Sequence, residues 1–227
     1  MEPPERLPQH QPAPEGRQET VPTILTTPET APTLTTELPS SRIWRLSVEQ
    51  YHEMLRTGIL QEDDPVELID GLLVQRTRKS PRHAVARTLL MKTLHGVLPA
   101  GWIFRIQSAL HFADSMPEPD VAIVRGVRRN YADHHPTNRD CALVIEVADD
   151  SLEIDRGIKW RTYARHSIAE YWIVNLPDEQ IDVYSEPSGL VARPGYRAMQ
   201  TFRAGESIPL NLDGVEVALI PVTAVLP

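Results

Sequence analysis

The sequence predicts an α/β fold in which a mixed β-sheet is flanked by helices. An apolar strand pattern over residues 142–147 is followed by a helical pattern up to about residue 165 and by a second strand pattern over residues 170–175. A helix between two strands is typical of a parallel crossover. The connections between the preceding strand patterns are short and favour antiparallel neighbours, so both kinds of pairing are expected in one sheet with helices on its faces.

The length and composition fit a soluble protein with one well-filled core. The chain has 227 residues, of which 41% are hydrophobic and 24% charged, and these values are ordinary for globular proteins. No apolar run approaches the roughly 18 residues that a membrane span needs, and the N-terminal residues lack the apolar centre of a secretory signal. The single cysteine, Cys141, excludes an internal disulfide and suits a reducing compartment. We therefore expect a cytoplasmic protein.

Residues 1–40 differ in composition from the rest of the chain. They are rich in Pro, Thr, Glu and Gln and show no hydrophobic periodicity, so they cannot bury enough apolar surface to offset the entropy of ordering. We expect a disordered tail here and a folded domain over residues 41–227. Six acidic residues and two arginines in the tail account for half of the net charge of −8.

The folded part begins with a short helix and a hairpin. Ser47 followed by Gln50 matches the capping box that opens helices, and apolar side chains recur after it at helical spacing. Two strand patterns follow, over residues 66–69 and 72–75, and the pair Asp70-Gly71 joins them. Asp-Gly between two short strands predicts a β-hairpin.

A long helix is expected from Ser80 to Leu98, because Ser80-Pro81 matches a cap followed by a first helical residue. Near its start, His83 is expected to cap or to pack. The predicted buried stripe comprises Val85, Leu89, Leu90, Leu94 and Val97. Basic residues gather around the helix start, namely Arg76, Arg78, Lys79, Arg82 and Arg87. Positive side chains at a helix N-terminus suit a phosphate group, and a solvated charged helix end explains the same pattern equally well.

Short strand patterns fill the remaining chain. We expect strands over residues 102–107 and 110–112, which could also form one bent strand, and over residues 121–124, 142–147, 170–175 and 181–185. Residues 125–140 are polar and predict a loop or short lid. Residues 190–227 predict short strands and turns that extend or cover the sheet.

Two acidic residues stand beside neighbouring strand patterns. Asp120 follows Pro119 at the mouth of one strand, and Glu146 ends the apolar run of the next. Alone, an aspartate after proline is typical of a turn, and a single glutamate at a strand end is typical of a surface. Together, the two acids and a backbone carbonyl near Val147 offer the oxygen ligands that Mg²⁺ prefers. Such an ion would polarise a phosphodiester and lower the pKa of a bound water.

A lysine on the following helical pattern completes this arrangement. Asp155 and Lys159 are four residues apart, a spacing that by itself predicts a modest surface salt bridge. Beside a metal ion, the ammonium group of Lys159 would orient the attacking water or stabilise the charge that develops on the phosphate. We assign Asp155 the structural role of orienting Lys159.

Five segments occur in a recognisable order between about residues 45 and 185: VELIDGLLV, SPRH, EPDVAIV, LVIEVADDSLEIDRGIKWRTYARHSIAEYWIVN and IDVY. This series resembles the Uma-two family of bacterial restriction endonucleases, within the PD-(D/E)xK nuclease superfamily. The resemblance implies a restriction-endonuclease-like fold and hydrolysis of DNA phosphodiester bonds that depends on Mg²⁺ or Mn²⁺. DNA would then be the partner, without any membrane association.

The resemblance also assigns roles by position. Asp120 and Glu146 correspond to the metal ligands, and Glu67, in the first hairpin strand, corresponds to a further acidic ligand. The simpler superfamily pattern has its lysine two residues after the acid, where this chain has Ala148. The role of the catalytic lysine therefore passes to Lys159.

One departure from the family keeps a second function open. Asp149 and Asp150 follow Glu146 at a corner that usually carries small residues, and their charges would repel DNA unless a metal ion or arginines offset them. The alternative is a non-catalytic nucleic-acid-binding or regulatory domain that retains the nuclease fold. A homodimer fits the first function, because cutting both strands often calls for two active sites.

Overall fold

A mixed six-stranded sheet forms the centre of the chain, with its strands in the order β3-β4-β5-β6-β7-β8. The computed structural model describes residues 42–77 and 79–227, and from Trp44 onward they form one compact unit. The predicted disordered tail over residues 1–40 lies outside the described residues. The strands are β3 (Trp102–Ile106), β4 (Val121–Arg125), β5 (Cys141–Ala148), β6 (Glu170–Asn175), β7 (Gln180–Pro187) and β8 (Tyr196–Arg203).

The pairing within this sheet is as the sequence predicts. β5 and β6 are parallel, with Glu146 opposite Ile173, because the helical segment between them returns the chain to the same end of the sheet. The other neighbouring strands of the sheet pair antiparallel. The expected mixed sheet is therefore confirmed.

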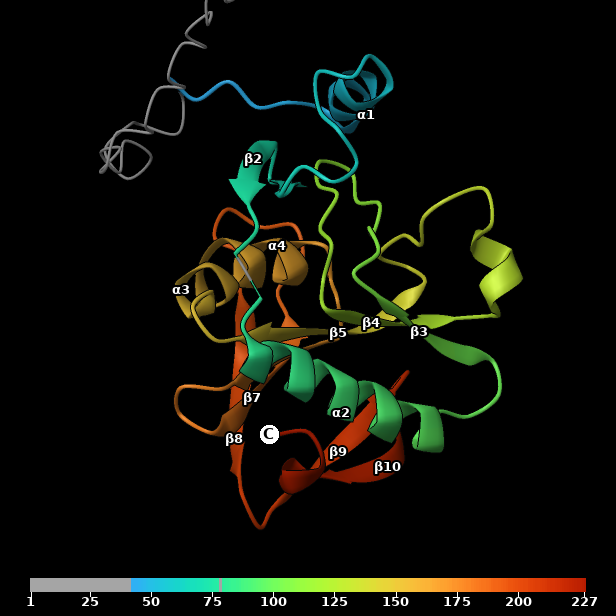
Figure 1. Ribbon diagram of the computed structural model, residues 1–227, viewed down its shortest axis with the longest axis vertical. Helices are drawn as coiled ribbons and strands as arrows, with labels where there is room; N and C mark the ends of the chain where they lie inside the picture. The colour runs from blue at the N-terminus through green and yellow to red at the C-terminus, as the bar shows by residue number, and fades with distance from the viewer. Residues whose placement is uncertain (1–41, 78) are drawn as a thin grey trace, which may run out of the picture. The chain divides into compact units, whose positions relative to one another are not determined.

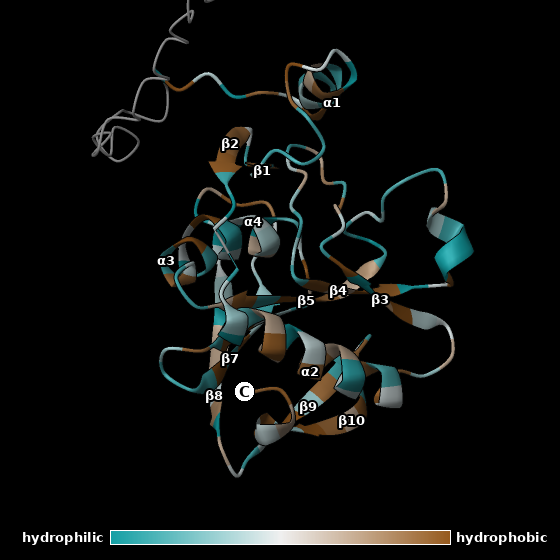
Figure 2. Ribbon diagram, viewed as in Figure 1, coloured by the Kyte–Doolittle hydropathy of each residue, from teal (hydrophilic) through white to brown (hydrophobic). Residues whose placement is uncertain are grey.

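Different layers cover the two faces of the sheet (Figure 1). One face packs against α2 (Pro81–Val97) and against the hairpin of β9 (Ser207–Leu212) and β10 (Val215–Pro221). The other face packs against α3 (Leu152–Ile154), a π-helical turn (Asp155–Lys159) and α4 (Trp160–Arg165). A short 3₁₀ turn, Val222–Ala224, follows β10. Hydrophobic residues are concentrated in the central strands and in β9 and β10 (Figure 2).

The strand β5 shows how the two layers fix the direction of each side chain. Leu143, Ile145 and Val147 belong to the core on the α2 side, whereas Val144 and Ala148 belong to the core on the α4 side. Since side chains alternate along a strand, Glu146 must point to the α4 side. Coverage on both faces also explains why the strand reads as a continuous apolar run.

A small layer lies before α2 in the chain and consists of α1 (Val48–Arg56), β1 (Val66–Ile69) and β2 (Leu72–Gln75). α1 begins at Ser47 with the predicted capping box to Gln50. β1 and β2 form the predicted antiparallel hairpin. At its turn, Asp70 and Gly71 both have positive φ, 51° and 72°, which suits the Asp-Gly pair.

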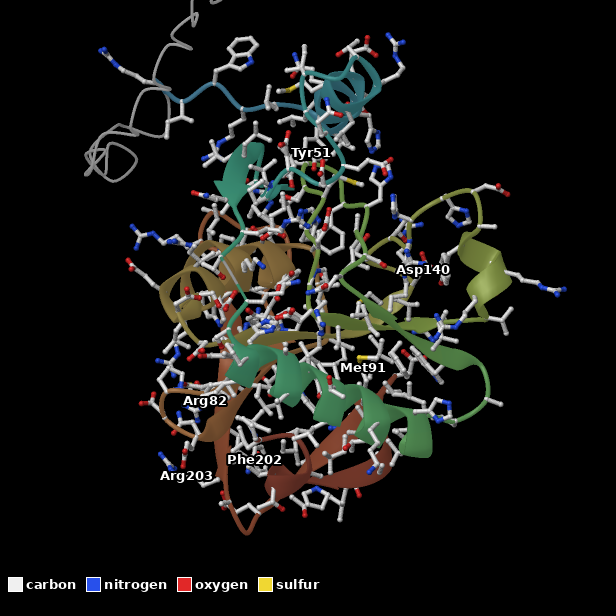
Figure 3. The ribbon with its side chains drawn as sticks, in the orientation of Figure 1. Tyr51, Arg82, Met91, Asp140, Phe202 and Arg203 are labelled. Carbon is white, nitrogen blue, oxygen red and sulfur yellow. The ribbon has the colours of Figure 1, made fainter. Side chains whose placement is uncertain are left out.

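Helix α2 begins at the predicted cap, where the Ser80 side chain accepts from the N–H of His83. The predicted buried stripe is wrong in part, since Val85 is 48% exposed. The buried line instead contains His83, Ala86, Leu90 and Leu94, so a polar and a small side chain replace larger apolar ones in the first turns. The core that this line joins includes Phe202 of β8, labelled in Figure 3.

Two further predictions need correction. Residues 110–112 are not a strand, because the N–H groups of Leu110 and Phe112 donate to the carbonyls of Pro117 and Ser115 within a local loop. The predicted helix up to residue 165 is interrupted by the π-helical turn. The polar segment 125–140 contains a 3₁₀ turn, Arg128–Tyr131. Among the described residues, no helix has the length and apolar character needed to cross a membrane.

Candidate active site

Two neighbouring strands bring Asp120 and Glu146 together. Val121 of β4 pairs with Ile145 of β5, so the residues next to this pair, Asp120 and Glu146, also lie beside each other. The backbone N–H of Asp120 donates to Glu146 Oε2 at 3.2 Å. In return, the N–H of Val147 donates to Asp120 Oδ2 at 3.0 Å. Each carboxylate is thus fixed by the backbone of the neighbouring strand.

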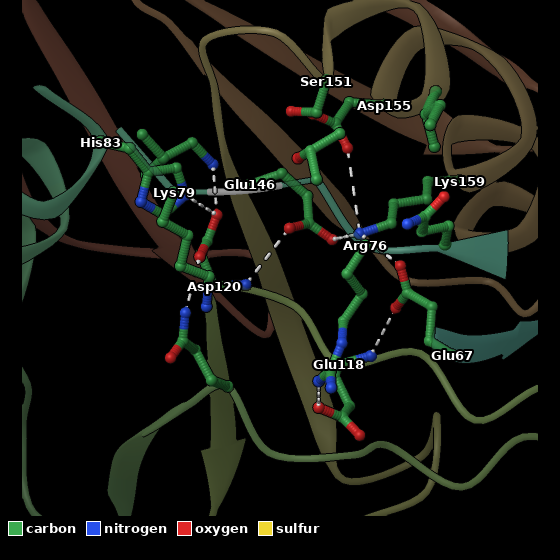
Figure 4. Close-up of a pocket in the computed structure, with 15 residues that line it drawn as sticks. Glu67, Arg76, Lys79, His83, Glu118, Asp120, Glu146, Ser151, Asp155 and Lys159 are labelled. Atoms are coloured by element: carbon green, nitrogen blue, oxygen red, sulfur yellow. Dashed lines mark hydrogen bonds and ion pairs between the residues drawn. The ribbon is translucent and has the colours of Figure 1, made fainter. Parts of the chain in front are cut away.

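Lys159 reaches these strands from the helical segment that covers them (Figure 4). Its Nζ lies 3.0 Å from Glu146 Oε1 and 2.9 Å from Glu67 Oε1, and it is 3.9 Å from Asp155 Oδ1. The side chain is only 10% exposed. The ammonium group is therefore a buried cation that contacts two glutamates from different parts of the fold.

The π-helical turn sets the position of this lysine. Its wide backbone is marked by the N–H of Trp160, which donates to the carbonyl of Asp155. The hydroxyl of Tyr171 donates to the same carbonyl at 3.1 Å, and the hydroxyl of Ser151 donates to Asp155 Oδ2 at 2.6 Å. Asp155 is thus anchored at both its backbone and its side chain, as its predicted structural role requires. Single π turns are frequent at functional sites.

Glu67 arrives in the same pocket from β1. It is 1% exposed, and its Oε2 accepts from the backbone N–H of Glu118 at 2.8 Å while its Oε1 contacts Lys159. Glu118 in turn forms an ion pair with Arg76. The structure therefore brings all four predicted site residues into one pocket.

Two further side chains bond to these acids. His83 Nε2 lies 2.9 Å from Asp120 Oδ2, and the Tyr163 hydroxyl donates to Glu146 Oε1 at 2.9 Å. The sequence expectation for His83 was capping or packing. Tyr163 was not predicted, although it lies four residues after Lys159 and hence on the same side of the helix.

Negative charge is in excess at the centre of the site. The four acidic side chains buried there are Glu67, Asp120, Glu146 and Asp155, and they surround a single buried ammonium group, that of Lys159. Burial raises the pKa of Glu146. The positive charge of Lys159 acts to lower this pKa, and the neighbouring carboxylates act to raise it. Burial by itself would lower the pKa of Lys159, but the surrounding glutamates and Asp155 raise it well above its ordinary value. Lys159 is therefore charged at neutral pH.

Asp120 responds differently from Glu146. Burial acts to raise its pKa, but the hydrogen bond and charge of His83 and the N–H of Val147 outweigh burial and lower the pKa. Asp120 is thus held as a carboxylate beside Glu146, whose proton is retained to a higher pH. The pKa values of the two acids therefore differ. A bound divalent ion would reduce this difference, since it favours the charged form of both carboxylates.

The donor set fits a hard divalent cation with an incomplete protein shell. Within residues 42–77 and 79–227, no three or more His, Cys, Asp or Glu side chains are arranged to hold a metal ion by themselves. Mg²⁺ commonly takes only one or two carboxylates and fills its shell with waters and substrate phosphates. Asp120 and Glu146 supply two carboxylates on one pocket wall, and the excess of buried negative charge favours a bound cation.

The acidic corner after β5 is tied to the start of α2. The hydroxyl of Ser80, the cap of that helix, donates to Asp149 Oδ2 at 2.5 Å. Asp150 is exposed. One of the two corner charges is thus held by a hydrogen bond, and the other faces solvent.

The mixed sheet, with two carboxylates on adjacent strands and a lysine on the following helix, defines the class of this chain as an α/β protein with a nuclease-like fold. More particularly, the chain belongs to the Uma2 family, whose model, described as "Putative restriction endonuclease", matches residues 48–220. The predicted family and fold are confirmed.

A solved structure from Anabaena variabilis, described as a putative nuclease belonging to DUF820, has the same fold. It superimposes with a TM-score of 0.60 at 11% sequence identity, over 79% of this chain and 97% of that chain. A search of curated proteins gave no match.

Proposed function

We propose that this chain is a metal-dependent endonuclease that hydrolyses DNA phosphodiester bonds. The observation that carries the proposal is the contact between Lys159 Nζ and Glu146 Oε1 at 3.0 Å, beside Asp120 on the adjacent strand. Burying so many charged groups in a sheet lowers stability compared with apolar packing. Groups of perturbed, buried acids and bases in one pocket are typical of functional sites.

In this proposal Asp120 and Glu146 hold Mg²⁺ or Mn²⁺. The ion would supply Lewis-acid polarisation of the phosphodiester and a lower pKa for the attacking water. Lys159 stays protonated and directs its N–H groups toward the pocket, where they orient that water or stabilise charge on the phosphate. Glu67 Oε1 contacts the ammonium group of Lys159 at 2.9 Å. The proposed ligand role of Glu67 would require this contact to be exchanged in part for the ion.

Two side chains act as positioning residues in the same proposal. His83 holds Asp120 through the 2.9 Å contact to Oδ2, which leaves Oδ1 with one long contact, from Gln107 Nε2 at 3.4 Å. Tyr163 holds Glu146 through its hydroxyl. Partners of this kind orient metal-binding carboxylates.

The test is a cleavage assay on supercoiled and linear DNA with Mg²⁺, Mn²⁺ or EDTA. Asp120→Asn, Glu146→Gln and Lys159→Met should each lower metal-dependent cleavage by about 10²–10³-fold. Glu153→Gln removes the same charge from an exposed position of the same helical segment and should cut like the wild type. Full metal-dependent cleavage by Glu146→Gln would refute the assignment.

A non-catalytic nucleic-acid-binding or regulatory domain is the second candidate, because the exposed charge of Asp150 would repel DNA from the candidate active site. It predicts a gel shift with DNA and no cleavage with any divalent metal. We propose the cytoplasm as the location for either function, since the use of a single cysteine, Cys141, suits a reducing compartment. A homodimer follows from the endonuclease proposal only if both strands are cut at one position, and sizing the protein on DNA tests this.

A further inference from the structure

A second pocket is built on the same helical segment as the catalytic pocket. Lys159 ends the π-helical turn, and the next two residues, Trp160 and Arg161, line this second pocket. Its other side is formed by the loop between β7 and β8 and by the first residues of β8, including Arg193 and Arg197. The cavity volume is about 720 Å³, which lies in the range of pockets that hold ligand-sized groups.

The charge of this pocket is opposite to that of the chain. Its lining contains three arginines, Arg161, Arg193 and Arg197, and no acidic residue among the described residues. All three arginines are exposed. In the described part of the chain none of them forms an ion pair with a carboxylate. We call this site the arginine pocket.

The catalytic pocket cannot supply affinity for a polyanion by itself. Its described lining contains five carboxylates and three permanent cations. Even with one divalent ion bound, this lining would carry no net positive charge. Since phosphate contacts with lysine and arginine provide most non-specific affinity for DNA, the basic groups that bind DNA must lie elsewhere on the chain.

The wall of the arginine pocket is preformed. The N–H of Ser188 donates to the carbonyl of Gly195 at 2.9 Å, and the N–H of Gly195 donates to the hydroxyl of Ser188 at 3.0 Å. These bonds close the loop that carries Arg193, and the N–H of Gly189 ties it to α4 through the carbonyl of Ala164 at 3.2 Å. A fixed loop presents its arginine with a lower entropy cost on binding.

The indole of Trp160 forms the inner side of the pocket. Gly195 packs so closely on it that an added Cβ would lie 2.4 Å from the ring, so only glycine fits there. The buried indole N–H of Trp160 has no acceptor among the described residues. The close contact with Gly195 fixes the indole as one wall of the arginine pocket.

We infer that the arginine pocket binds backbone phosphates of the DNA strand whose neighbouring phosphodiester enters the catalytic pocket. The inference rests on the proposed endonuclease function. Guanidinium groups match phosphate oxygens with paired N–H donors, and three of them spread over a helix, a loop and a strand suit successive phosphates better than one small anion. The helical segment that carries Lys159 also contributes Trp160 and Arg161 to the arginine pocket.

The test measures binding separately from cleavage. Fluorescence anisotropy with duplex DNA, in EDTA to prevent cutting, gives the binding constant from 50 to 200 mM salt for the wild type and for Arg161→Gln/Arg193→Gln/Arg197→Gln. The variant should bind at least about 10-fold more weakly at the lower salt concentration, and the salt slope should fall by about 1 for each lost phosphate contact. Arg193→Gln alone, on the closed loop, should lower the slope by about 1.

A matched control removes the same charge elsewhere. Arg56, Arg128 and Arg129 are exposed and lie outside both pockets, so their triple glutamine variant should keep the wild-type slope. Thermal melting verifies that both variants fold. Inorganic phosphate is titrated as well, because a single-anion site would bind it and leave the DNA slope unchanged in the arginine variant.

The outcomes separate the two proposals. If no metal supports cleavage but DNA binding depends on these arginines, the endonuclease proposal fails and the arginine pocket stands. If the wild type cuts DNA and the arginine variant keeps its slope, the arginine pocket is refuted and the endonuclease proposal stands. Equal losses in the control variant, or no DNA binding by the wild type, also overturn the inference.

Discussion

Replacing Lys159 by methionine removes a buried cation while retaining much of the side-chain volume. In the wild type its ammonium group contacts Glu67 and Glu146 at 2.9 and 3.0 Å, and Asp155 is 3.9 Å away. These three acids are 1–3% exposed, so water cannot replace the lost charge. Removing one partner of a buried ion pair costs about 3–5 kcal/mol.

For a chain of this size, a loss of about 3–5 kcal/mol lowers the melting temperature by about 6–20 °C.

Glu146→Gln should behave differently, because burial raises the pKa of Glu146 to about 8 and the amide therefore replaces a carboxyl that is mostly protonated at pH 7. The amide loses at most about one hydrogen bond, which is worth about 1 kcal/mol. Lys92→Met, at an exposed position of α2, is the matched control and should change stability by less than about 0.5 kcal/mol.

Urea unfolding followed by circular dichroism, in EDTA at pH 7, measures these differences. The expected order of stability is wild type, Lys92→Met and Glu146→Gln close together, with Lys159→Met well below them. If Lys159→Met unfolds at the midpoint of Lys92→Met, the ammonium group does not compensate the buried acids. An equal loss of stability in Glu146→Gln would contradict the retained proton of Glu146.

The remaining predictions concern pH, metal and packing. Burial raises the pKa of Glu146 to about 8 and that of Asp155 to about 6, so the metal-free folded protein holds protons that the unfolded chain releases. The free energy of unfolding should therefore fall as the pH rises from about 4 to 8, and it should fall less in Glu146→Gln. Urea midpoints across this pH range measure the effect. A flat wild-type profile would contradict it. Saturating Mn²⁺ should raise the melting temperature more at pH 8 than at pH 6 and should have no such effect on Asp120→Asn. His83→Ala should weaken Mn²⁺ binding by about 10–100-fold in calorimetric titration; unchanged affinity would exclude its positioning role. Leu94→Ala, in the fully buried core, should cost about 2–5 kcal/mol in urea and retain the metal-dependent cleavage of the folded protein.

Much of the sheet could be predicted because its strands are covered on both faces. β5 is buried along its whole length, so its sequence is a continuous apolar run bounded by polar residues. In residues 110–112 the apolar Leu110 and Phe112 alternate with His111, yet the N–H groups of Leu110 and Phe112 bond within a loop closed by Pro117 and Ser115. Three residues carry too little periodicity to distinguish these cases. The wrong prediction for Val85 has a similar cause. Helical spacing predicts a buried stripe on α2, but it does not reveal which of two adjacent stripes packs against the sheet.

The candidate site could be predicted where neighbouring strands define it. Asp120 and Glu146 follow from the strand order and register, which the hydrophobic patterns contain. The contact of Lys159 depends on a π-helical turn, and its sequence is indistinguishable from an ordinary helix. Only the family resemblance indicated Lys159. His83 was missed as a partner because its bond to Asp120 joins residues 37 positions apart.

The distribution of charge gives the two proposals a common physical basis. Half of the net charge of −8 lies in residues 1–40, and the candidate active-site pocket concentrates much of the remainder around Lys159. Acids that bind a divalent cation must repel DNA when the cation is absent. A nuclease of this charge therefore needs a separate basic surface close to its lysine, and the arginine pocket, which begins at the next residue, meets that requirement. Substitutions in the arginine pocket should then weaken DNA binding in EDTA, whereas cleavage should depend on both sites.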